Sequence, residues 1–141
     1  MGGILVDHDT DTLQLAADRL FRGAGIRRGM QVLDLGCGTG DLSIAAAELV
    51  GPNGLVLGID VDADVLETAR RRAWEADLDQ VYFLGTSLEN LRDEGPFDVI
   101  LVRMGSHLNS KAILSRAARL LRENGLIAVL DESGAVTTQA A

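Results

Sequence analysis

Apolar residues along this chain recur at two spacings, one typical of helices and one typical of buried strands. Apolar side chains three or four residues apart predict helices at about 11–24, 42–50, 62–76, 88–92 and 110–123. Short, continuous apolar runs predict strands at 31–35, 55–59, 81–84, 97–102 and 126–130. Because strands and helices alternate and the strands are apolar on both faces, we expect one α/β domain whose parallel sheet has helices on each side.

Capping residues set the ends of several predicted elements. Asp62 is placed to cap the third helix, and Asn109 or Ser110 the last one. Asn124 and Gly125 are expected to stop that last helix. The residues from 134 to 141 are small or polar, and we expect them to be a frayed, disordered tail behind a domain that ends at residue 133.

Three glycines at alternate positions join the first predicted strand to its helix. Gly36, Gly38 and Gly40 follow Asp34 in the order Asp-Leu-Gly-Cys-Gly-Thr-Gly. Such a turn needs backbone angles that glycine adopts easily, and it lets a ligand approach bare backbone. The spacing differs from the G-x-G-x-x-G of dinucleotide-binding loops. A carboxylate beside exposed N–H groups suits a ligand with an amino group better than it suits a pyrophosphate.

The segment 34–40 resembles the first motif of the class I S-adenosylmethionine-dependent methyltransferases, and the resemblance extends over about residues 12–132. It implies a Rossmann-like, three-layer α/β sandwich with a mostly parallel sheet of about five strands. It also implies S-adenosyl-L-methionine as the cofactor and in-line transfer of its methyl group to a small-molecule acceptor. The loop residues it assigns to cofactor binding are Asp34, Gly36, Cys37, Gly38, Thr39 and Gly40. Cys37 is expected to pack as a small apolar residue rather than act as a nucleophile.

Further cofactor contacts are expected where the second and third strands end. Asp60 can accept hydrogen bonds from both ribose hydroxyls, and Val61 beside it can pack on the adenine. A helix cap is the alternative role for this aspartate, but Asp62 fills that position better. After the third strand come Thr86, Ser87 and Leu88, where many methyltransferases carry an aspartate that binds the adenine amino group. The Ser87 hydroxyl can accept that bond more weakly, or Thr86 or Ser87 simply caps the short helix.

The segment after the fourth strand resembles that of the ubiquinone/menaquinone-type and related small-molecule methyltransferases. By that resemblance, Arg103 and Met104 line the cofactor. His107 is a candidate general base, with a structural role as the alternative. Asp131 and Glu132 follow the fifth strand and are expected to be solvated acids, with a position facing the acceptor as the alternative.

The seven-stranded fold that is usual in this family continues beyond the fifth strand, whereas this chain stops soon after it. We therefore expect a C-terminally truncated sheet with a bare edge, which favours a homodimer formed through that edge. Two functions stay open. One is an active methyltransferase, compact or completed by dimerisation. The other is a cofactor-binding module or fragment without transfer activity, completed by a partner chain or acting as a non-catalytic subunit. A nicotinamide-dependent oxidoreductase is disfavoured by the glycine spacing.

The composition of the chain argues against several classes of binding partner. The net charge of −8 leaves no basic face for nucleic acid, and we expect the run Arg70-Arg71-Arg72 to be a solvated helix face. Cys37 is the only cysteine, so no disulfide within the chain and no cysteine-based zinc site is expected, nor any other metal site. Without a signal peptide or an apolar run long enough to cross a bilayer, the chain is expected to be cytoplasmic and free of membrane contact.

Overall fold

The computed structural model describes residues 8–92, 94–103, 110–131, 133 and 135–140. Its elements, in chain order, are α1 (His8–Ala24), β1 (Gln31–Leu35), α2 (Asp41–Val50), β2 (Leu55–Asp60), α3 (Ala63–Glu75), β3 (Val81–Gly85), the 3-10 helix η2 (Leu88–Asn90), β4 (Phe97–Arg103), α4 (Lys111–Ala118), β5 (Leu121–Leu130) and β6 (Val136–Ala140).

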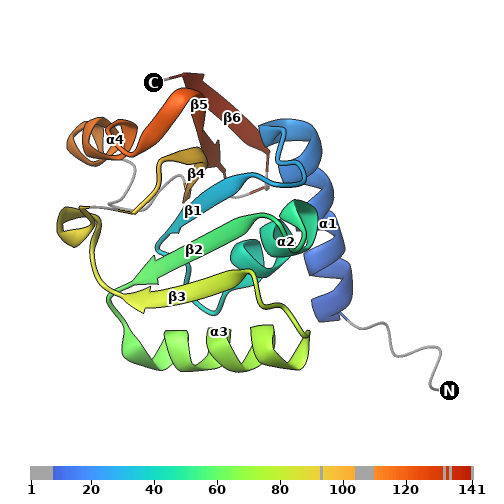
Figure 1. Cartoon of the computed structure of the whole chain (residues 1–141). Coiled ribbons are helices and arrows are strands. Elements are labelled where there is room, and N and C mark those ends of the chain that lie inside the picture. The colour runs from blue at the N-terminus through green and yellow to red at the C-terminus, as the bar shows by residue number, and fades with distance from the viewer. Residues whose placement is uncertain (1–7, 93, 104–109, 132, 134, 141) are drawn as a thin grey trace, which may run out of the picture.

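The strands form one sheet in the order β3-β2-β1-β4-β5-β6, in which β1 to β5 are parallel and β6 is antiparallel to β5 (Figure 1). The expected mostly parallel sheet is therefore confirmed. From β1 the chain first adds β2 and β3 on one side of β1, and then adds β4, β5 and β6 on the other side. The strand order thus reverses beside β1, which is where ligands bind in open sheets of this kind.

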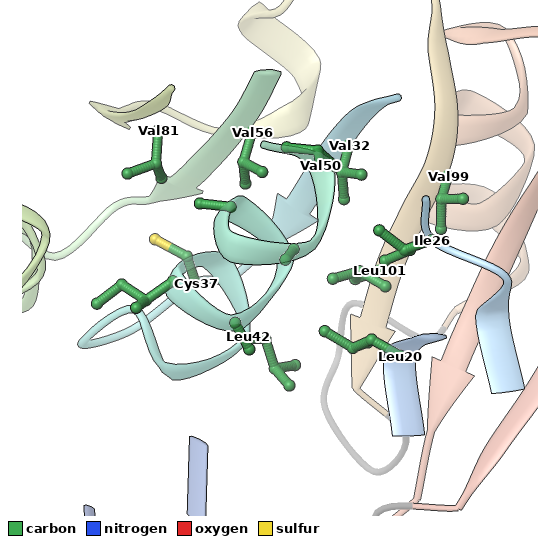
Figure 2. Packing of buried hydrophobic residues seen from close by; sticks show 14 of the residues in the cluster. Leu20, Ile26, Val32, Cys37, Leu42, Val50, Val56, Val81, Val99 and Leu101 are labelled. Carbon is green, nitrogen blue, oxygen red and sulfur yellow. The ribbon is translucent and has the colours of Figure 1, made fainter. Parts of the chain in front are cut away.

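Helices cover both faces of the sheet. Helices α1, α2 and α3 pack on one face, while η2 and α4 pack on the other. Figure 2 shows Leu20 of α1 and Ile26 close to Leu101 of β4 in the first of these layers. Leu20 is 0% exposed, and burying such a side chain contributes about 1.5–3 kcal/mol to folding. The three-layer sandwich is thus held by two aliphatic cores, one on each face.

The end of the last helix differs from the expectation. Helix α4 stops at Ala118, and β5 already begins at Leu121, which pairs with Phe97. The register then shifts, and Asn124, with φ 69°, lies in the irregular stretch that follows. The Asn124-Gly125 pair therefore marks a bulge within a strand, because pairing with β4 overrides the helical spacing of the apolar residues. Ser110 caps α4 as expected, accepting a 3.2 Å hydrogen bond from the Ile113 N–H.

The expectation of a frayed tail and a bare edge at β5 is wrong. Residues 136–140 form β6, which pairs along β5 and lies against α1. Asp131 builds the turn between the two strands, since its Oδ1 accepts hydrogen bonds from the N–H groups of Ser133 and Ala135, both at 2.9 Å. The sheet consequently has six strands instead of about five. Glu132 lies outside the described residues.

Candidate functional site

A cavity of about 240 Å³ opens at the carboxyl ends of β1, β2 and β3. Six residues expected from the sequence line it together, namely Gly36, Asp60, Val61, Thr86, Ser87 and Leu88. Ile113 of α4 also lines it, as does Glu89, and neither was expected. Its volume approaches the ~300–1,000 Å³ typical of small-molecule sites, and its lining is mostly apolar with a few polar residues.

The glycine loop has the backbone geometry that its spacing predicts. Gly36, Gly38 and Gly40 have φ values of 68°, 56° and 92°, all in the region that favours glycine. A Cβ atom on Gly40 would lie 3.1 Å from the Cβ of Ala69, so this glycine lets the loop pack on α3. A Cβ on Gly38 would meet nothing within 4 Å. The loop therefore has one glycine that packs and one that faces open space.

Asp60 connects the loop to the end of β2. Its Oδ2 accepts a 3.0 Å hydrogen bond from the Gly38 N–H, and its Oδ1 accepts a 2.9 Å bond from the Asp62 N–H. The Asp62 side chain in turn caps α3, as expected, by accepting from the Asp64 N–H. Each carboxylate oxygen offers two acceptor positions, so Asp60 can still accept from a ligand at the cavity mouth.

Asp34 lies under the loop and is 0% exposed. Its Oδ2 accepts a 2.7 Å hydrogen bond from Ser43 Oγ, whereas its Oδ1 has no partner within the described part of the chain. Burial raises the pKa of Asp34 to about 6, against the opposing effects of the Arg103 charge and the Ser43 hydrogen bond. The carboxylate expected at an open strand end is thus an interior group, and its Oδ1 is the oxygen without a partner among the described residues.

Gly58 makes room for this buried pair and was not expected to matter. A Cβ there would lie 2.8 Å from Ser43 Oγ and 3.0 Å from the Cβ of Cys37. A glycine inside an apolar strand was the one signal in the sequence that could have indicated this close approach.

Arg72 also belongs to the site, although the sequence predicted a solvated basic run. Its Nη1 donates to the Thr39 carbonyl oxygen at 2.9 Å and to Asp41 Oδ1 at 2.6 Å. Arg70 is engaged as well, donating from Nη2 to the Phe83 carbonyl oxygen at 2.8 Å. Arg70 and Arg71 nevertheless have the expected exposed positions, the latter beside Glu75, and only Arg72 of the three is partly buried. Arg72 therefore ties α3 to the loop and to the first turn of α2.

The polar residues after β3 do not act as simple helix caps. Ser87 occupies the N-cap position of η2, but its hydroxyl accepts no backbone hydrogen bond there. It accepts instead from Asn90 Nδ2 at 3.3 Å. The Thr86 N–H donates to the Asp60 carbonyl oxygen at 3.1 Å, which joins the ends of β3 and β2. The Thr86 hydroxyl donates to the Ser87 carbonyl oxygen at 3.4 Å, and both residues line the cavity.

Cys37 and Arg103 complete the described part of the site. Cys37 is 0% exposed, and burial, followed by the nearby Asp34, raises the pKa of its thiol to about 12. The thiol therefore stays protonated and packs as an apolar group (Figure 2). Arg103 lies exposed at the end of β4 and is close enough to Asp34 to influence its pKa. Met104 and His107 lie outside the described residues.

Residues 26–140 match the family model described as a methyltransferase domain. The demethylmenaquinone methyltransferase of Listeria monocytogenes serotype 4a is 33% identical over 111 residues, covering 77% of this chain and 47% of that protein. The nocamycin O-methyltransferase of Saccharothrix syringae is 35% identical over 130 residues, covering 90% of this chain and 46% of that protein. The chain spans about half the length of these curated relatives. The crystal structure of TrmN from Thermus thermophilus superposes with a TM-score of 0.71 at 32% identity, covering 82% of this chain and 37% of that one.

Proposed function

The chain belongs to the class I S-adenosylmethionine-dependent methyltransferase family, and from that premise we propose that it binds S-adenosyl-L-methionine and transfers its methyl group to a small-molecule acceptor. The observation that carries this proposal is the hydrogen bond from the Gly38 N–H to Oδ2 of Asp60, a residue that lines the cavity. It holds a glycine with open space in front of it beside a carboxylate that retains acceptor capacity.

The residues present fit this cofactor. Val61 is 79% exposed and, with Leu88 and Ile113, offers apolar surface to a flat ring. Asp60 offers carboxylate oxygens to two neighbouring hydroxyl groups. Because nothing lies within 4 Å of where a Gly38 Cβ would be, the methionine part of the cofactor could approach the backbone there. A larger side chain at this position would occupy that space. Bound there, the cofactor would supply a methyl group on a sulfonium whose departure as a neutral sulfide needs no acid.

The remaining assignments are proposed from the family resemblance, and those at Asp60, Val61, Thr86, Ser87 and Leu88 are supported by the cavity lining. We assign the ribose hydroxyls to Asp60, the adenine faces to Val61 and Leu88, and the adenine amino group to the hydroxyl of Thr86 or Ser87. The methionine part is assigned to the loop from Gly36 to Gly40, with Asp34 beneath it. Arg103 and Met104 would line its far end, and His107 is the candidate base for a protonated acceptor.

The chain's contribution to the reaction is mainly alignment. Asp60 and Arg72 fix the loop, so the bound cofactor would be held in one position while the acceptor approaches. A histidine such as His107 would remove a proton from an O–H or N–H acceptor. The alternative, a binding module without transfer, is favoured by no specific observation.

We also infer a cytoplasmic protein that does not bind nucleic acid. Within the described residues, no helix is both long and apolar enough to cross a membrane. A homodimer would have to form elsewhere than at β5, since β6 occupies that edge. Light scattering of the purified chain tests the homodimer, with a mass of about 30 kDa expected for two copies of this 15.0 kDa chain.

Transfer activity is tested by incubating the chain with S-adenosylmethionine and panels of phenols, carboxylic acids and amines, and measuring S-adenosylhomocysteine. Acceptor-dependent product from at least one panel supports the proposal. An Asp60→Ala variant run in parallel should lose that product because it loses the cofactor. Product that persists undiminished in this variant would contradict the site assignment.

A further inference from the structure

A second cavity lies between η2 and α4, on the face of the sheet opposite to α1, α2 and α3. Its volume is about 240 Å³. Its apolar lining consists of three leucines, namely Leu88, Leu91 and Leu120. Three arginines complete the lining, namely Arg92, Arg116 and Arg119. The hollow is therefore lined half by leucines and half by exposed arginines that bring several positive charges to one place.

Among the described residues, no ion pair joins Arg92, Arg116 or Arg119 to a carboxylate. Within the described ranges, none of their three side chains makes a hydrogen bond either. Arg72 and Arg122, by contrast, are paired with Asp41 and Asp98. The acid next to the hollow in the sequence, Glu94, uses its Oε2 to accept from the backbone N–H of Arg92.

A purely structural explanation covers only part of this arrangement. Arg116 and Arg119 lie at the end of α4, where cations favour the helix dipole. That argument does not extend to Arg92, which follows η2 and reaches the same hollow. In a chain of net charge −8, positive charge gathered in one place without partners attracts anions from solution.

We propose that this hollow binds a small anion that carries several phosphate or carboxylate groups. Guanidinium groups pair with both of these groups through two parallel hydrogen bonds, which a point charge does not provide. The leucine lining lowers the local dielectric constant and strengthens those bonds. The site is separate from the cofactor cavity, with Leu88 as a shared wall residue. The proposal does not depend on methyl transfer.

Calorimetric titration of the whole chain at low ionic strength tests this site. The probes are inorganic pyrophosphate, citrate and a short glutamate peptide, which separate phosphate, small-carboxylate and acidic-peptide ligands. The test variant is Arg116→Gln/Arg119→Gln. Arg22→Gln/Arg71→Gln is the matched control, because it removes the same charge from exposed positions on the other face. Circular dichroism verifies that both variants are folded.

Saturable binding of pyrophosphate or citrate is expected, weakened about tenfold or more in the test variant and by no more than about twofold in the control. If both variants lost affinity equally, the binding would depend only on the net charge of the protein, and the proposal would be overturned. Absence of saturable binding to either small anion would also overturn it. Binding of the glutamate peptide alone would overturn the proposal of a small anion and would indicate an acidic protein partner instead.

Discussion

Ser43 Oγ donates a 2.7 Å hydrogen bond to Asp34 Oδ2, and both side chains are completely buried. The bond joins the first turns of α2 to β1 directly beneath the glycine loop. It is possible because Gly58 on the neighbouring strand leaves the necessary space. A buried carboxylate oxygen without a hydrogen-bond partner is costly, and Asp34 Oδ1 has none among the described residues.

Ser43→Ala should destabilise the protein by about 1–3 kcal/mol, because it leaves a buried carboxylate without its hydrogen-bond donor. Urea denaturation followed by circular dichroism measures this change. Ser115→Ala, which removes an exposed hydroxyl on α4, is the matched control and should change stability by less than about 0.5 kcal/mol. Equal stability of the two variants would show that the pair contributes nothing.

Asp34→Asn should change the pH dependence of stability. The pKa of Asp34 is raised from 3.8 to about 6 in the folded state, so the folded protein holds a proton there that the unfolded chain has lost. This group therefore makes stability fall as pH rises from about 4 to 6, by up to about 3 kcal/mol, and adds no slope outside that window. Urea unfolding at several pH values should show that the asparagine variant lacks this fall. An unchanged difference from the wild type across the window would refute the assignment.

Arg72→Gln should destabilise the loop and the protein together. The substitution removes charge-assisted hydrogen bonds to Thr39 and Asp41, with an expected loss of about 1–2 kcal/mol at this partly exposed position. Arg71→Gln removes the neighbouring exposed arginine and should have an effect below about 0.5 kcal/mol. Urea denaturation measures the free energy of unfolding of both variants and of the wild type. If both variants unfold at the same urea concentration, Arg72 is a surface residue like its neighbour.

Asp131→Ala should loosen β6 without unfolding the rest. Its Oδ1 accepts from the N–H groups of Ser133 and Ala135 and from the Ser133 hydroxyl, and these bonds shape the turn. Hydrogen exchange at residues 136–140 should accelerate about tenfold, while exchange in β1 stays unchanged. Glu123→Ala, an exposed acid in β5, provides the comparison. Unaltered exchange in β6 would mean that pairing with β5 alone defines this strand.

Much of the fold was predictable because its signals are local. The apolar runs of β1 to β4 are bounded by turn residues, and each glycine of the loop is required by its own backbone angle. The end of α4 was not predictable, since Leu121 continues the helical spacing but pairs with Phe97 in the sheet. Strand β6 was missed because its short, mostly polar sequence resembles an unstructured terminus, and pairing with β5 is what makes it a strand.

The residues of the site also fall into two groups, those that the sequence predicts and those that only the packing of the fold reveals. Asp60 and the glycine loop could be placed from the sequence, because parallel strands bring their carboxyl ends to one edge. Arg72, Gly58 and Ile113 depend on how α3, β2 and α4 pack around that edge, and no local pattern specifies such contacts. The burial of Asp34 belongs to this second group, since strand spacing does not reveal which neighbour covers a side chain.

The central claim is that this loop and Asp60 bind S-adenosylmethionine, and calorimetric titration of the wild type, Asp60→Ala and Asp64→Ala tests it most directly. Asp64 is the matched control, an exposed acid in the first turn of α3. The account predicts saturable binding to the wild type and to Asp64→Ala, and about tenfold or greater weakening in Asp60→Ala from the loss of charge-assisted hydrogen bonds. Equal affinity in all three proteins, or no binding by the folded wild type, would contradict it.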